Sequence, residues 1–166
     1  MILAEASQGN WLQFMGHFHP MLVHLPIGML YIAGILHFFA KEKTSSSTII
    51  RILLWTCGFS IISAALGWSL AQSGEYDPST LQIHQWLGVS TCLLSAALAY
   101  ALYAEVAHRL TNVLFILCLT CLTITGHFGG NLTHGSDYLI ASLPASAREM
   151  LGITHEENLT VIKITN

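Results

Sequence analysis

The chain of 166 residues is 53% hydrophobic and only 9% charged, with a formal net charge of −3. Soluble domains carry about 25% charged residues, so this composition indicates a protein embedded in a membrane. The sequence has no basic patch and gives no support to nucleic-acid binding. Histidine is frequent, with nine histidines against six lysines and arginines together. Because histidine is costly in lipid, we expect several of them to have a function or a bonding partner.

Four apolar stretches predict membrane-spanning helices, because each supplies the roughly 20 residues that cross a bilayer. Their expected bounds are 21–40, 49–72, 81–104 and 110–127. Short polar loops join them, which favours an up-down-up-down arrangement. The predicted fold class is therefore all-α, an integral membrane four-helix bundle over residues 21–135.

The two flanks are expected to lie at the membrane surface. Residues 1–20 form a polar-to-aromatic lead-in, in which Trp11 and Phe18 suit the headgroup region. Residues 136–166 are expected to form a short interfacial amphipathic helix and a tail, because apolar residues recur there at helical spacing.

The distribution of basic residues predicts an orientation. Lys41, Lys43 and Arg51 flank the first loop and Arg109 lies in the third, whereas the second loop has no lysine or arginine. By the positive-inside rule, both termini and the second loop are expected outside. We therefore expect a multi-pass protein of the bacterial inner (cytoplasmic) membrane, with the lipid bilayer around it and both termini in the periplasm.

All four cysteines lie inside apolar stretches: Cys57, Cys92, Cys118 and Cys121. The last two have CxxC spacing, but Leu122 follows in place of the histidine that covalent c-type haem attachment requires. We interpret the cysteines as small packing residues.

Six of the nine histidines are expected near one membrane depth, at the outer ends of the helices. They are His17, His19, His24, His84, His127 and His134. His24 and His84 lie one turn inside the first and third helices, whereas the others lie at or beyond the boundary. This layer is the predicted functional region.

The chain also has the pattern of two hairpins in tandem. His24 and His84 are each followed four residues later by a glycine, Gly28 and Gly88. The first and third helices of such a bundle are diagonal, so we expect His24 and His84 to face each other. The glycines lie on the same helix faces and would leave room for a flat ligand. A b-type haem with two axial histidines has these requirements. A structural polar network and a transition-metal site are the alternatives.

A second repeat concerns the outer rim. The segments GHFHPMLVH and GHFGGNLTH share the pattern G-H-F-x-x-x-L-x-H. His17, His19, His127 and His134 could build a second outer site, either for a second haem or for Cu or Zn, since imidazole suits these metals. A hydrogen-bonded cap made by the same residues is the alternative.

Two further histidines are expected to have no ligand role. His37 lies toward the inner side, and the third helix has Ala97 at the equivalent position, so an inner haem would lack its second ligand. His108 is expected in a solvated loop.

These motifs resemble a family of uncharacterised bacterial four-helix membrane proteins. The family has openings like HPMLVHLPIG, at residues 19–28, and a segment like GHxGGxLTHG, matched here by residues 126–135. The resemblance spans about residues 16–140. It implies an association with c-type cytochrome or Rieske-type modules, and hence electron transfer. It supplies no catalytic residue.

The sequence therefore favours a membrane protein that binds one or two b-type haems and transfers electrons at the periplasmic face, with a c-type cytochrome or Rieske-type partner. Its axial ligands would be His24 and His84. We expect an electron carrier rather than an independent catalyst. The alternatives are a membrane protein that binds Cu or Zn, and a non-catalytic anchor or assembly subunit of a redox complex. The sequence is also compatible with a homo-oligomer.

Overall fold

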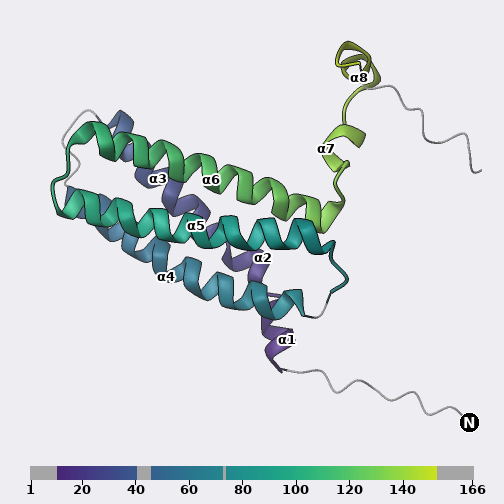
Figure 1. Ribbon diagram of the computed structural model, residues 1–166, viewed down its shortest axis with the longest axis horizontal. Coiled ribbons are helices and arrows are strands. Elements are labelled where there is room, and N and C mark those ends of the chain that lie inside the picture. Colours follow the sequence, from purple (N-terminus) through teal and green to yellow (C-terminus); the bar gives the residue numbers. More distant parts are fainter. Residues whose placement is uncertain (1–10, 41–45, 73, 153–166) are drawn as a thin grey trace, which may run out of the picture.

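The computed structural model describes residues 11–40, 46–72 and 74–152, and these form helices and connecting turns without strands (Figure 1). Four helical segments are long and apolar enough to cross a membrane. They are Trp11–Phe39, Ser46–Ala71, Pro78–Tyr103 and His108–His134. The predicted all-α four-helix bundle is confirmed. The parts of the two flanks predicted over residues 1–10 and 153–166 lie outside the described residues.

The first segment is broken into three helices, α1 (Trp11–Gly16), α2 (His19–Leu22) and α3 (His24–Phe39). Much of the stretch expected as an interfacial lead-in is thus helix, and α1 and α2 pack on α4. Gly16 allows this contact, because a Cβ there would lie 2.8 Å from the backbone nitrogen of Leu70. The first segment is therefore anchored to the second along its whole length.

The other spanning helices are longer than predicted. They are α4 (Ser46–Ala71), α5 (Pro78–Tyr103) and α6 (His108–His134). The largest difference is at α6, which was expected to end at residue 127. The helix continues through its glycines to Gly135, whose φ of +92° and amide bond to the carbonyl of Asn131 end it. Packing on α5 offsets the helix-weakening effect of the glycines.

Helices adjacent in sequence are adjacent in space: α3 packs on α4, α4 on α5, and α5 on α6. The first segment and α5 are therefore diagonal, as an up-down-up-down bundle requires (Figure 1). We call the end where α4 and α6 finish and α5 begins the histidine end, and the other the core end.

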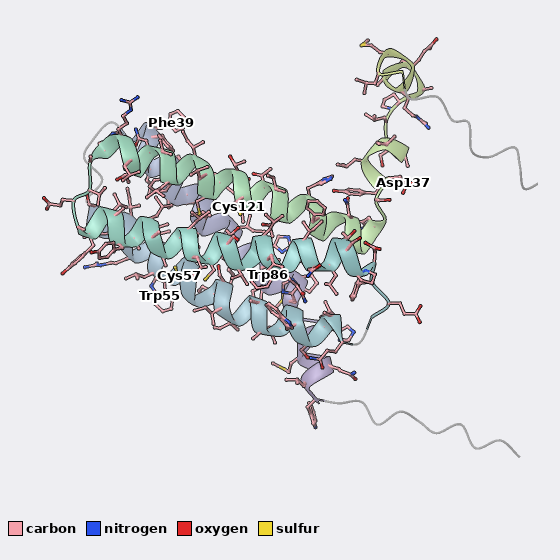
Figure 2. All side chains as sticks on the ribbon, viewed as in Figure 1. Phe39, Trp55, Cys57, Trp86, Cys121 and Asp137 are labelled. Atoms are coloured by element: carbon pink, nitrogen blue, oxygen red, sulfur yellow. The ribbon has the colours of Figure 1, made fainter. Side chains whose placement is uncertain are left out.

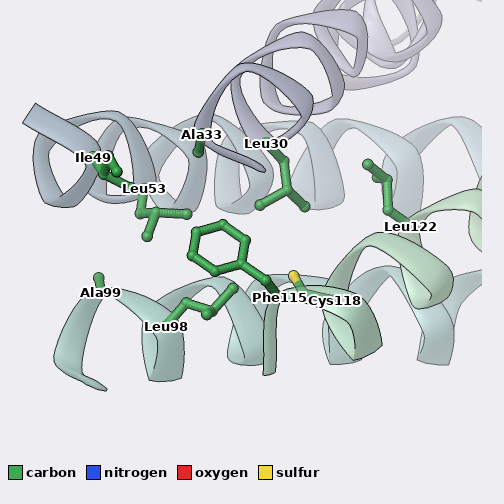
Figure 3. Close-up of a cluster of buried hydrophobic side chains, with 9 residues drawn as sticks. All are labelled: Leu30, Ala33, Ile49, Leu53, Leu98, Ala99, Phe115, Cys118 and Leu122. Carbon is green, nitrogen blue, oxygen red and sulfur yellow. The ribbon is translucent and has the colours of Figure 1, made fainter. Parts of the chain in front are cut away.

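The buried apolar core lies toward the core end (Figure 3). It consists of Leu30, Ala33, Ile49, Leu53, Leu98, Ala99, Phe115, Cys118 and Leu122. Phe115 fills its centre with no exposed surface. Cys118 packs in this core, and all four cysteines are free. Large apolar side chains such as Trp55 and Trp86 are about two-thirds exposed, as lipid-facing residues are expected to be (Figure 2).

After α6 the chain forms two short helices, α7 (Tyr138–Ala141) and α8 (Ala145–Met150), in place of one amphipathic helix. Pro144 separates them with extended backbone angles. A proline disfavours helical conformation at the residue before it, which accounts for the break. Leu139 and Leu151 remain exposed in these segments.

Candidate functional site

A cavity of about 590 Å³ lies inside the histidine end of the bundle. It exists because the first helical segment leans toward α4: Tyr31 joins α3 to Thr123 of α6 by a hydroxyl–hydroxyl hydrogen bond of 3.0 Å, whereas α1 and α2 pack on α4. Every spanning segment contributes to its wall. The histidines on the wall are His19, His24, His84 and His134.

His19 is held against α4 by the backbone of that helix. Its Nδ1 lies 2.8 Å from the carbonyl oxygen of Ser63 and 3.1 Å from the Ser63 hydroxyl. Since a carbonyl only accepts, Nδ1 carries the proton and Nε2 keeps its lone pair. Gly67, one turn later, makes the approach possible, because a Cβ there would lie 3.0 Å from the ring.

His84 is held against α6 in the same way. Its Nδ1 donates to the carbonyl of Thr125 over 3.0 Å, and the ring packs on Gly129. A Cβ at Gly129 would lie 3.0 Å from Cε1 of His84. Its Nε2 therefore also keeps a lone pair. Gly129 lies four residues after Thr125, whose carbonyl accepts this hydrogen bond, just as Gly67 lies four residues after Ser63.

The two rings lie close together in the cavity. The ring centres of His19 and His84 are 6.4 Å apart and the ring planes make an angle of 84°. Each is half-buried, and each belongs to a different hairpin of the bundle. The fold therefore brings together two histidines from different hairpins, each with one nitrogen bound to a helix carbonyl.

The ring that faces His84 is that of His19 rather than that of His24, which the sequence predicted. His24 is exposed, lies on the cavity wall, and donates Nδ1–H to the carbonyl of Pro20 in its own helical segment. The backbone stays helical at Val23, between α2 and α3. Residues five apart point about 140° apart around a helix axis, so only one of His19 and His24 can face His84.

Gly28 and Gly88, the glycines predicted to leave room for a flat ligand, lie in different surroundings. Gly88 lies on the cavity wall, and a Cβ there would meet only Cγ2 of Thr125, at 3.9 Å. Gly28 is exposed, does not line the cavity, and has no atom near its Cβ position. The close-packing glycines are instead Gly67 and Gly129.

The predicted outer site is not brought together as one group. His17 is exposed and donates Nδ1–H to the carbonyl of Gln13, and His127 is exposed beside Phe128. Neither lines the cavity. His134 does line it, at the end of α6, with its ring 5.5 Å from that of Tyr138.

A bare metal ion finds few ligands in the part of the chain that the structure describes. No three side chains of histidine, cysteine, aspartate and glutamate come together there in a group able to hold one. Structural zinc sites use four protein ligands and catalytic sites three. The His19–His84 pair offers two.

A separate histidine cluster occupies the core end. Nε2 of His37 lies 2.7 Å from the side-chain oxygen of Asn112, and the ring stacks on Phe115 with centres 4.3 Å apart. His108, predicted in a loop, is the first residue of α6; it is exposed and stacks on His37 at 5.4 Å. This cluster packs against the core through Phe115.

No family model, curated protein or solved structure matches the chain. The function therefore has to be inferred from the cavity and its histidines.

Proposed function

We propose that this chain binds one b-type haem between His19 and His84 and transfers electrons within a membrane. The observation that carries the proposal is the pair itself. Two imidazoles from diagonal segments lie close together in an apolar cavity, each with Nδ1 bound to a helix carbonyl.

The spacing of the rings supports ligation of one metal between them. A metal–imidazole bond is about 2.0 Å long, so two nitrogens on opposite sides of one ion are about 4 Å apart and their ring centres about 6 Å apart. The observed separation of the ring centres of His19 and His84 is 6.4 Å. The separation of the two ring centres therefore matches that of two imidazoles on one metal ion.

The hydrogen bonds support the same role. A metal-bound histidine almost always donates its other ring N–H to a carbonyl, a carboxylate or water, which fixes the tautomer and the ring orientation. The carbonyls of Ser63 and Thr125 do this for His19 and His84. Both rings are thus preorganised as ligands through Nε2.

The cavity suits a large flat ligand that is mostly apolar. Its volume of about 590 Å³ falls within the usual range for ligand sites of about 300–1,000 Å³. Small residues line much of it, among them Ser63, Ala64, Gly88, Gly126 and Gly130.

The chemistry follows from the ligand set. Haem supplies a reversible one-electron couple, and the chain would hold it, orient it and exclude water from it. If His19 and His84 both bound the iron, no coordination position would be left for a substrate, which favours an electron carrier over a catalyst. We extend the proposal to a c-type cytochrome or Rieske-type partner at the periplasmic face of a bacterial inner membrane.

The test is to purify the protein after expression with ample haem and to record oxidised and reduced absorption spectra together with the haem content. We expect one haem b per chain, a Soret band and a sharp α-band on reduction. His19→Ala and His84→Ala should each remove the six-coordinate spectrum, whereas His17→Ala should keep it because His17 lies outside the cavity. A colourless protein, or ligand variants with unchanged spectra, would contradict the proposal.

A further inference from the structure

Histidine and tyrosine are the ionisable residue types on the described wall of the cavity. Among the described residues of the wall there is no lysine, arginine, aspartate or glutamate, and its ionisable side chains are His19, His24, Tyr76, His84 and His134. In the proposed complex His19 and His84 bind iron through Nε2 and keep Nδ1–H on a carbonyl, so neither can take up a proton. Tyr76 carries a phenol, a group that stays neutral around pH 7.

That leaves His24 and His134 as the wall residues able to carry positive charge. Both are exposed, so they form the rim of the cavity. Nδ1–H of His24 is already bound to the carbonyl of Pro20, and the free Nε2 can accept a proton without breaking that bond. His134 lies in the last turn of α6, where helix carbonyls favour a cation.

We infer that His24 and His134 receive the carboxylates of the haem, and that the protonated fraction of these imidazoles rises when the iron is reduced. This rests on the proposed function. A haem b carries two carboxylates, which need cationic or hydrogen-bonding partners in a membrane. Among the described residues of the wall, the rim histidines are the groups that can provide a positive charge.

The coupling follows from charge balance. One electron from the redox partner converts ferric to ferrous iron and adds one negative charge to the site. In a low-dielectric surrounding this charge attracts a proton from water to Nε2 of a rim histidine, so that one electron and one proton enter together. Three carboxylates lie near this rim: Glu75 and Asp77 line a neighbouring cavity that shares Tyr76 and Leu132 with this one, and Oδ1 of Asp137 lies 3.4 Å from the Cβ position of Gly135, next to His134.

The test is the pH dependence of the midpoint potential of the bound haem, measured by optical redox titration from about pH 5 to 9, the range in which histidine titrates. We expect the wild-type potential to fall with pH at a slope approaching one proton per electron. In the double variant His24→Gln with His134→Gln, haem affinity should fall because the carboxylates lose their partners, and the haem-loaded fraction should lose most of this slope. Each single variant should lose part of it.

His127→Gln is the matched control, since His127 is an exposed histidine of α6 that does not line the cavity. Its slope should equal that of the wild type. A wild-type potential independent of pH, or a double variant with the wild-type slope and an intact spectrum, would overturn the inference while leaving haem binding in place. Absence of haem from the wild type would overturn both proposals.

Discussion

The two ends of the bundle each hold a half-buried histidine beside α6, but in different ways. At the core end, Nε2 of His37 is bonded to a side chain, Asn112, and the ring is stacked on the fully buried Phe115. At the histidine end, His84 is bonded to the backbone at Thr125, through Nδ1, and faces a cavity and a second imidazole.

The comparison shows what distinguishes a structural histidine from a candidate ligand in a membrane protein. Burial and hydrogen bonding are common to both. The difference lies in whether a cavity adjoins the imidazole ring and in which ring nitrogen makes the hydrogen bond. His37 completes a packed core, whereas His19 and His84 keep Nε2 available beside a cavity of about 590 Å³.

The largest loss of stability is expected at the core end. Phe115→Ala should lower the free energy of unfolding by about 3–5 kcal/mol, because it removes a fully buried ring from the centre of the core. The haem spectrum of the folded fraction should be unchanged. Ile116→Ala is the control, since that side chain is 56% exposed on the same helix. Denaturant unfolding in detergent measures the difference, and equal stabilities of the two variants would contradict this account of the core.

The glycines under the rings provide the sharpest test of the histidine end. Gly67→Ala and Gly129→Ala would each place a Cβ 3.0 Å from an imidazole and push it out of position. Overpacking of this kind costs about 1–3 kcal/mol, so haem affinity should fall about 5- to 150-fold.

Gly28→Ala is the control, because Gly28 does not line the cavity and no atom lies within 4 Å of its Cβ position. Haem titration of the apoprotein compares the three variants. The order predicted by the structure fails if Gly28→Ala weakens binding as much as Gly129→Ala.

A smaller effect is expected for the hydrogen bond at the core end. His37→Phe should keep the stack on Phe115 but leave the Asn112 side chain without this partner, at a cost of about 1–3 kcal/mol in stability. Haem content should not change. His108→Phe, at an exposed position beside it, should be close to neutral. Loss of haem from His37→Phe would contradict the assignment of a purely structural role to His37.

The smallest effect concerns the start of α5, which positions His84. The hydroxyl of Ser79 and the amide of Thr80 donate to the Asp77 carboxylate over 2.6 and 2.8 Å, and they lower its pKa to about 2. Because the folded-state pKa lies below the ordinary value of 3.8, the stabilisation is complete above that value and is lost as the pH falls toward 2.

Asp77→Ala should therefore unfold at a lower temperature than the wild type near neutral pH, and the two melting curves should converge as the pH approaches 2. Thermal melts across that range measure this. A gap between the melting curves that does not change with pH would show that these hydrogen bonds do not stabilise the helix start.

Much of the fold could be predicted because hydropathy sets it. Four stretches of about 20 apolar residues and short loops leave few arrangements other than an up-down-up-down bundle. The helix ends were harder to predict, because packing on α5 keeps α6 helical through Gly129 and Gly130.

The site was predicted in part. The layer of histidines and the tandem repeat pointed to this end of the bundle, and His84 lines the cavity there. His19 was assigned to the outer rim, because the first spanning helix was predicted to begin at residue 21, whereas α1 and α2 are helical and pack His19 against α4.

A usable signal was present in the second and fourth helices. Ser63 and Gly67 have the same spacing as Thr125 and Gly129. In the structure each of these pairs lies against one of the two facing imidazoles, Ser63 and Gly67 against His19 and Thr125 and Gly129 against His84. A small hydroxyl residue followed four positions later by glycine is therefore a pattern worth seeking where histidines approach membrane helices.

The most direct test of the central claim is the low-temperature electron paramagnetic resonance spectrum of the ferric protein. The planes of His19 and His84 lie at 84°. Two nearly perpendicular axial imidazoles produce a strongly anisotropic low-spin signal, and this is the predicted result. A high-spin signal, or the less anisotropic low-spin signal of parallel imidazoles, would contradict ligation by this pair in this geometry.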